Sequence, residues 1–195
     1  FRRGRGDLMV MNLRTGETRT LVEGWDSSIQ WRWSPDSRYI AYSQHDLNFS
    51  ANIHIVPADG SRRPVNITRH PRNDRNPRWS ADGRVLTFVS NRSGNSYDLY
   101  RVYLDPALEN YTARELSTYY RNARTAATQR RPLPVRTADA ADTPQTARPE
   151  LELEEAWRRI RRVTALPTHQ SANEMTPGTE STSSRSRTAV EVMPS

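Results

Sequence analysis

One stretch of the sequence occurs twice, and this repetition constrains the fold more than any other feature. Residues 33–43 are matched by residues 79–90, and the tryptophans that open the two copies, Trp33 and Trp79, are 46 residues apart. A second marker, at residues 52–56, precedes its match at residues 98–102 by the same 46 residues. Self-similarity at a period of this size is typical of repeat architectures. The chain therefore reads as a series of equivalent units.

Each full unit carries four short apolar stretches separated by turn residues. The copy at residues 25–70 predicts strands at 29–33, 39–43, 53–56 and 64–68. The copy at residues 71–119 predicts a strand ending at Trp79, strands at 85–89 and 98–104, and a weaker fourth strand from Ala113 to Thr118. Residues 7–24 predict a hairpin that is the back half of an earlier copy. Four strands per unit of this length form the blade of a β-propeller, so residues 1–119 predict an all-β, partial propeller of four-stranded antiparallel blades.

The recurring residues are interpreted as structural because a blade-forming turn must recur with every blade, whereas a catalytic group need not. The tryptophans could line a ligand channel, but large aromatic side chains more often pack between sheets. The aspartates could be paired acids, but a turn-capping role suits their setting better. The positions interpreted in this way are Trp33, Pro35, Asp36, Trp79, Asp82 and Gly83.

The remainder of the chain departs from the repeat. Residues 120–149 carry few large apolar side chains and predict a linker or insert. Residues 150–167 predict a short helix, with acids first and arginines last, followed by the start of a degraded repeat. Residues 168–195 are rich in Ser, Thr, Pro and Glu and predict a disordered tail.

Composition excludes several kinds of site. The formal net charge is +7 and all basic residues are arginine, but they are spread along the chain, which argues against a nucleic-acid partner. There is no cysteine, and the four histidines lack metal-site spacing, so neither a metal nor a cofactor is expected. No apolar run approaches the roughly 20 residues that span a bilayer, so no membrane partner is expected. Ser34 and Ser80 lack the setting of a nucleophile elbow, and no catalytic residue is predicted.

The repeated unit, together with residues 91–100, resembles the Tricorn/TolB-type propeller repeat. Residues 134–136 and 157–167 narrow the likeness, because the propeller region of tricorn-like serine peptidases has a comparable Arg-Ile-Arg-Arg-Val-Thr segment after a polar insert. In that family a further repeat follows. Residues 175–180 stand where its turn belongs, without a convincing strand after them.

The resemblance implies a fragment of a multidomain hydrolase whose propellers gate or scaffold peptides for proteolysis in a separate domain. Its partners would be peptide or protein substrates, and several chains could assemble into one ring. The family implies a cytoplasmic location, with a periplasmic or secreted one if a signal sequence precedes Phe1. The alternative is a TolB-like propeller that binds proteins and has no enzymatic activity.

Overall fold

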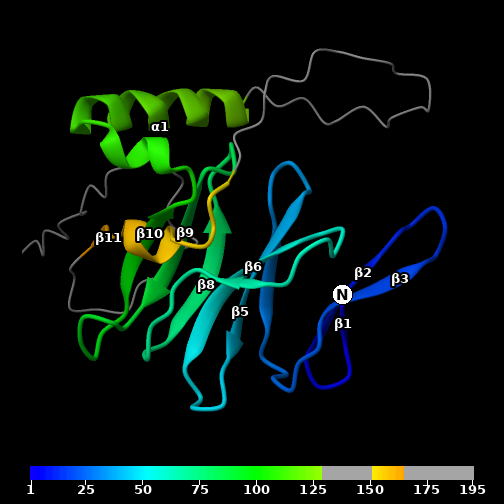
Figure 1. Cartoon of the computed structure of the whole chain (residues 1–195). Coiled ribbons are helices and arrows are strands. Elements are labelled where there is room, and N and C mark those ends of the chain that lie inside the picture. The colour runs from blue at the N-terminus through cyan, green and yellow to red at the C-terminus, as the bar shows by residue number, and fades with distance from the viewer. Residues whose placement is uncertain (129–150, 165–195) are drawn as a thin grey trace, which may run out of the picture.

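The computed structural model describes residues 1–128 and 151–164. In these ranges the chain is mostly β, with three antiparallel sheets that lie side by side and one α-helix (Figure 1). Among the described residues, no helix has both the length and the apolar character needed to cross a membrane.

The first sheet is small and ends in a hairpin. It contains β1 (Arg2–Arg3), β2 (Asp7–Met11) and β3 (Thr18–Val22), in the order β1-β2-β3. The turn between β2 and β3 passes through Gly16 at φ +75°, a left-handed conformation that glycine adopts at little cost. The predicted hairpin is therefore present, with β1 added at its edge.

The second sheet is formed from consecutive strands. These are β4 (Gln30–Trp33), β5 (Tyr39–His45), β6 (Ala51–Pro57) and β7 (Val65–Asn66), and each pairs with the next. The buried side chains of β5 and β6 include Ile40, Ala41, Ile53 and Ile55. Because both faces of these strands carry apolar residues, neighbouring layers cover the sheet on both sides.

The third sheet is closed by a strand from much further along the chain. Its order is β11-β10-β9-β8, formed by β8 (Asp74–Trp79), β9 (Val85–Ser90), β10 (Asp98–Tyr103) and β11 (Ile160–Arg162). Arg101 and Arg161 are directly opposite each other in the β10–β11 pair.

The fourth strand predicted from Ala113 to Thr118 is wrong, because this segment begins helix α1 (Ala113–Thr128). Thr112 and Glu115 form a capping box, in which the Thr112 backbone N–H donates to Glu115 Oε2 at 2.7 Å and the Glu115 N–H donates to Thr112 Oγ1 at 3.4 Å. Leu116, Tyr119 and Tyr120 then fall on one helical face and pack on the end of the third sheet, together with the 3₁₀ helix η1 (Pro106–Asn110). Figure 1 shows α1 lying across this part of the sheet.

The helix predicted within residues 150–167 is also wrong. In its described part, residues 151–164, one 3₁₀ turn forms, η2 (Ala156–Arg159), and the chain then continues into β11. Leu151 and Leu153 lie in an extended segment and pack against the core between the second and third sheets. Acids and arginines at helical spacing predict a helix here. Pairing of β11 with β10 and the packing of Leu151 and Leu153 against the core favour the extended chain instead.

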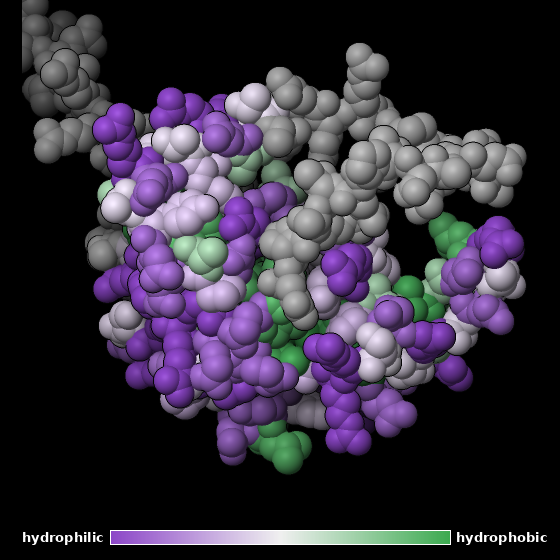
Figure 2. Space-filling view, turned by 45° about the horizontal axis from the view of Figure 1, so that its top comes forward, coloured by the Kyte–Doolittle hydropathy of each residue, from purple (hydrophilic) through white to green (hydrophobic). Residues whose placement is uncertain are grey.

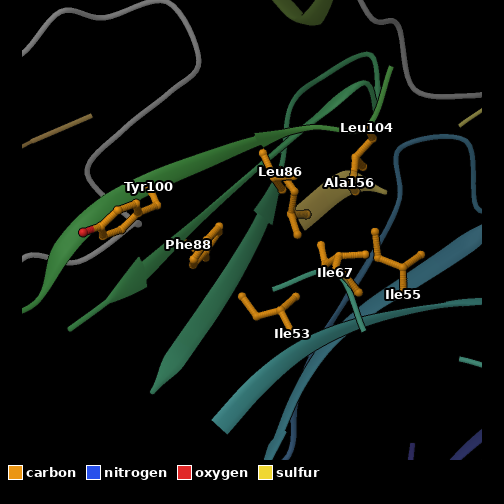
Figure 3. Packing of buried hydrophobic residues seen from close by; sticks show 10 residues of the cluster. Ile53, Ile55, Ile67, Leu86, Phe88, Tyr100, Leu104 and Ala156 are labelled. Carbon is orange, nitrogen blue, oxygen red and sulfur yellow. The ribbon is translucent and has the colours of Figure 1, made fainter. Parts of the chain in front are cut away.

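The main core lies between the second and third sheets. Ile53 and Ile55 of β6 face Leu86 and Phe88 of β9, with Ala156 of η2 at one end of the cluster (Figure 3). All six residues of β9 are buried. A smaller core, with Leu8 and Val22 on one side and Ile40, Tyr42 and Val56 on the other, joins the first sheet to the second.

The predicted degraded repeat at residues 175–180 and the predicted tail at residues 168–195 lie outside the described residues. So does the whole of residues 129–150.

Candidate functional site

The two repeated turns are stabilised by the same hydrogen bonds. In the first, Ser34 Oγ donates to Asp36 Oδ1 at 2.6 Å and accepts from the Tyr39 backbone N–H at 2.9 Å. Ser80 and Asp82 form the matching bond at 2.7 Å. The serine hydroxyls and the aspartate oxygens are thus engaged in local turn structure, and these contacts bring no histidine to either serine.

Pro35 and Gly83 belong to these turns but at different positions. Gly83 has φ +76°, and the equivalent residue of the first turn, Ser37, has φ +60°. Ser37 therefore adopts a left-handed conformation that a side chain disfavours. Pro35 precedes it, and its δ-carbon is the nearest atom to the place where a side chain on Gly83 would begin, at 3.6 Å.

The two tryptophans of the repeat have different surroundings. Trp79 packs against the core between the second and third sheets, and its indole N–H donates to the Arg32 carbonyl of β4 at 3.1 Å. Trp33 is 45% exposed, so the expected packing between sheets does not hold for it. In the described part of the chain, the first sheet contributes no strand that covers Trp33 as β4 covers Trp79.

A polar cluster occupies the end of the second sheet where β5 ends. Asp26 Oδ2 accepts from the His45 backbone N–H at 2.9 Å and lies 2.7 Å from His45 Nδ1. Asp26 Oδ1 accepts from the Ser28 hydroxyl at 2.7 Å. Arg75, from β8 of the third sheet, lies with Nη2 at 3.4 Å from His45 Nε2. Together these groups line a cavity of about 70 Å³.

The combination of Ser28, His45 and Asp26 does not have the geometry of a catalytic triad. A triad requires the serine on one ring nitrogen and the acid on the other. Here Ser28 Oγ lies 3.3 Å from Nδ1, the nitrogen that Asp26 already contacts, and donates its proton to Asp26. His45 Nε2 faces Arg75, whose guanidinium can only donate hydrogen bonds. His45 therefore links the second sheet to the third and does not act as a base for Ser28.

The electrostatics of Asp26 fit this structural role. Burial alone would raise its pKa, but hydrogen bonds from the backbone and side chains of His45 and Ser28 outweigh burial and lower the pKa well below its usual range. The carboxylate is therefore held ionised, and both of its oxygens accept hydrogen bonds.

A much larger groove, of about 860 Å³, lies at the opposite end of the second sheet. One wall comes from the turns beside β5 and β6, and the other from the extended segment before η2. Apolar contact is provided by Tyr39, Val65, Leu151 and Leu153, and the charged groups are Arg38, Asp59, Arg62, Glu152 and Glu154.

The acidic wall of this groove is fixed by arginines. Arg159 Nη2 contacts Glu152 Oε2 at 2.5 Å, and Arg69 Nη2 donates to the Glu154 carbonyl at 2.9 Å. Burial would raise the pKa of Glu152, but the backbone N–H of Glu155 and the Arg159 guanidinium lower it overall. The groove thus combines apolar walls with charges of both signs.

Within the described ranges, no group of three or more His, Asp or Glu residues could hold a metal ion. His45 bonds to Asp26, His54 stacks on Tyr42 with ring centroids 5.3 Å apart, and the Arg72 backbone N–H donates to His70 Nδ1. His169 lies outside the described residues.

The sequence does not predict the groove, because the segments that form its two walls are far apart along the chain. The alternation Leu151-Glu152-Leu153-Glu154 is nevertheless a signal for an extended segment.

Comparison with known proteins places this geometry in context. No family model matches the chain. Over 76 residues the chain is 34% identical to the "uncharacterized peptidase YuxL" of Bacillus subtilis (strain 168), a match that covers 35% of this chain and 11% of that protein.

Among solved structures, the crystal structure of the tricorn protease matches with a TM-score of 0.58 and 18% identity, over 84% of this chain and 16% of that chain. TolB from Acinetobacter baumannii matches with a TM-score of 0.43 and 21% identity, over 51% of this chain and 25% of that chain. The present chain thus spans only a minor part of the length of each. The similarity to the tricorn-type repeat seen in the sequence is confirmed at the level of the fold: the chain is similar in structure to a region of the tricorn protease.

Proposed function

We propose that this chain is the propeller part of a tricorn-like serine peptidase and that it binds and guides peptides without cleaving them. The observation that carries the proposal is the match of most of the chain to the tricorn protease, with its three sheets as two four-stranded blades and part of a third. The local match to YuxL supports it, since that protein is also named a peptidase. We place the protein in the cytoplasm as part of the same proposal.

The groove beside Val65 is the proposed contact for peptides. An extended peptide needs apolar pockets for alternate side chains and polar groups for its ends and amides. Val65, Leu151 and Leu153 offer the former, while Arg62 and Glu154 offer groups of opposite charge on the two walls. Such a site favours extended chains over folded proteins without selecting one sequence.

A non-catalytic role agrees with the arrangement of the hydroxyl groups. Ser34, Ser80 and Ser28 donate their protons to neighbouring aspartates, and His45 presents Nε2 to Arg75. These three hydroxyls are thus engaged in local bonds within the fold.

Peptide binding can be measured with fluorescein-labelled fragments of unfolded casein and the 195-residue chain, by fluorescence anisotropy and by mass spectrometry of the fragments. We expect saturable binding with unchanged fragment masses. Arg62→Glu should weaken binding several-fold, by about 1 kcal/mol, because it removes a donor from the groove. Arg63→Glu is the matched control, since this neighbour does not line the groove.

The proposal fails if the fragments do not bind or if the two variants weaken binding equally. New fragments produced by the chain itself would contradict the non-catalytic role.

A further inference from the structure

A second pocket lies beside the peptide groove, between the first sheet and the second, and has a volume of about 600 Å³. The side chains around it include Val10, Met11, Glu17, Thr18, Arg19 and Ala58. We call it the hairpin pocket. Figure 2 shows a mostly hydrophilic face of the molecule, on which hydrophobic side chains gather in small areas. An apolar lining such as that of Val10, Met11 and Ala58 is therefore a local feature of this surface.

The hairpin pocket and the groove occupy equivalent places in the repeat. Each is bounded on one side by the turn between the last two strands of a sheet, β2 and β3 for the pocket and β6 and β7 for the groove. Each is bounded on the other side by a residue that comes soon after the third strand of the next sheet, Ala58 after β6 and Pro106 after β10. The repeat thus forms an equivalent pocket at both junctions between the described sheets, as expected of the extended binding surfaces of repeat proteins.

A single turn separates the two pockets. Ala58 lines both of them, and Asp59 next to it lines the groove. The Gly60 N–H donates to the Pro57 carbonyl at 3.0 Å and closes a β-turn, whose ends lie within about 7 Å of each other. Because the partition is this narrow, one extended peptide can reach from the groove into the hairpin pocket.

The first sheet holds this turn in place. Arg19 Nη1 donates to the Asp59 carbonyl. Gly60 has φ +67° and packs closely on β3: a side chain at this position would begin 3.1 Å from Arg19 Cδ and 3.5 Å from Leu21 Cδ2. A residue that lines the hairpin pocket is therefore bonded to the wall of the groove.

We propose that the hairpin pocket is a second subsite of the groove and takes an apolar side chain of the same extended peptide. This inference rests on the proposed function and narrows its substrates to peptides with two apolar segments joined by a short polar stretch. Met11 suits such a subsite, because its unbranched thioether adapts to different apolar side chains and it is 43% exposed in the free chain. Glu17 and Arg19 have opposite charges, so the peptide needs no charged residue here.

The test uses the 195-residue chain and three fluorescein-labelled peptides, VLSQSQSVL, VLSQSQSQS and SQSQSQSVL. The five polar residues of the first peptide span up to about 17 Å when extended, which is enough to cross the turn. By fluorescence anisotropy, we expect VLSQSQSVL to bind about tenfold more tightly than either of the others, because only this peptide can bury an apolar segment in both pockets.

Met11→Ser is the decisive variant. It should weaken the binding of VLSQSQSVL about fivefold and leave the other two peptides unchanged, because it removes apolar contact from the hairpin pocket alone. Leu13→Ser is the matched control: Leu13 is 93% exposed in the same hairpin and does not line the pocket, so its affinity for VLSQSQSVL should equal that of the parent chain. Circular dichroism verifies that both variants are folded.

Arg62→Glu tests the groove separately and should weaken the binding of all three peptides. If it does so, but the parent chain binds the three peptides equally, the proposed function stands and the second subsite is refuted. Equal effects of Met11→Ser and Leu13→Ser on VLSQSQSVL would also refute the subsite. If the parent chain binds none of the peptides, the proposed function fails and the subsite with it.

Discussion

The second and third sheets share a similar repeated sequence at their start and are completed in different ways. Both start from a Trp-Ser turn with the same hydrogen bonds, and both have four antiparallel strands. The second sheet closes with β7, which starts at Val65, soon after β6 ends at Pro57. The third closes with β11, which starts at Ile160, long after β10 ends at Tyr103. A repeat can therefore keep its fold although its last strand is displaced along the chain.

Arginines secure the displaced strand. Arg159 is 6% exposed, and its guanidinium donates to the carbonyls of Tyr103 at 2.8 Å and Glu152 at 2.6 Å. Arg162 Nη2 contacts Asp98 Oδ2 at 2.6 Å. Both sheets share one threonine contact, because Thr68 Oγ1 accepts from the Ile53 N–H and Thr164 Oγ1 from the Leu99 N–H, each at 3.0 Å. The third sheet thus adds arginine contacts to this shared bond, one from the buried Arg159 and one from the half-exposed Arg162.

The largest effect is expected from breaking this clamp. Arg159→Met should destabilise the chain by about 2–3 kcal/mol, because it leaves the carbonyls of Tyr103 and Glu152 without their donor, while the partly exposed Glu152 carboxylate keeps the Glu155 N–H. Arg158→Met is the control. Its guanidinium is 66% exposed and pairs with Glu155, so the change should cost about 0.5 kcal/mol or less. Urea unfolding followed by tryptophan fluorescence measures both, and equal costs would show that the clamp does not hold the sheet.

The next largest effect is expected from the two tryptophans of the repeat, whose replacement by phenylalanine should cost different amounts of stability. Trp79→Phe removes an exposed hydrogen bond to the Arg32 carbonyl and part of the packing between the sheets, at a cost of about 1 kcal/mol. Trp33→Phe should cost a few tenths of a kcal/mol, since this side chain is about half exposed. Thermal unfolding monitored by circular dichroism compares them. A larger loss for Trp33 would mean that it is covered as fully as Trp79.

The buried acids of the two sheets should respond to pH with opposite signs. The pKa of Asp26 is lowered, so its contribution to stability is present above about pH 4 and is lost as the pH falls. Burial raises the pKa of Asp74, and the Arg92 guanidinium offsets only part of that effect, so its contribution is lost as the pH rises.

Asp26→Asn should therefore cost more stability near pH 6 than near pH 3, and Asp74→Asn should cost less near pH 6 than near pH 3. Urea unfolding of each variant and the parent chain at the two values gives the comparison. If the stability cost of both substitutions changes in the same direction between pH 3 and pH 6, the opposite pH responses of Asp26 and Asp74 are refuted.

The smallest effect is expected in the turns. Ser37→Gly should stabilise the chain by up to about 1 kcal/mol, because glycine relieves the left-handed conformation at φ +60°. Gly83→Ser should destabilise the other turn by a similar amount. If both changes are neutral in thermal unfolding, the positive φ values do not limit stability.

The sequence could predict the features whose bonds are local. The turn bonds of Ser34 and Ser80 join residues no more than five positions apart, so the same pattern is readable wherever it recurs. The start of α1 also has a local signal, since Thr112 and Glu115 have capping-box spacing, although the repeat pattern predicts a strand there.

Other features depend on distant partners and could not be read in this way. Arg159 reaches a carbonyl 56 residues away, and the Leu99 N–H donates to Thr164 Oγ1 65 residues away. Without these contacts, residues 150–162 have the charge pattern of a helix. The groove and the His45–Asp26 connector escaped prediction for the same reason, because each joins segments that only the folded chain brings together.

The most direct test of the displaced closure is a disulfide between β10 and β11. The chain has no cysteine, so Arg101→Cys with Arg161→Cys introduces a single pair at directly opposite positions. We predict that this variant, oxidised in the folded state, forms an intramolecular disulfide in nearly every molecule. The control pair, Arg101→Cys with Arg158→Cys, should form little. Absence of the disulfide in the first variant, or equal yields in both, would contradict closure of the third sheet by β11.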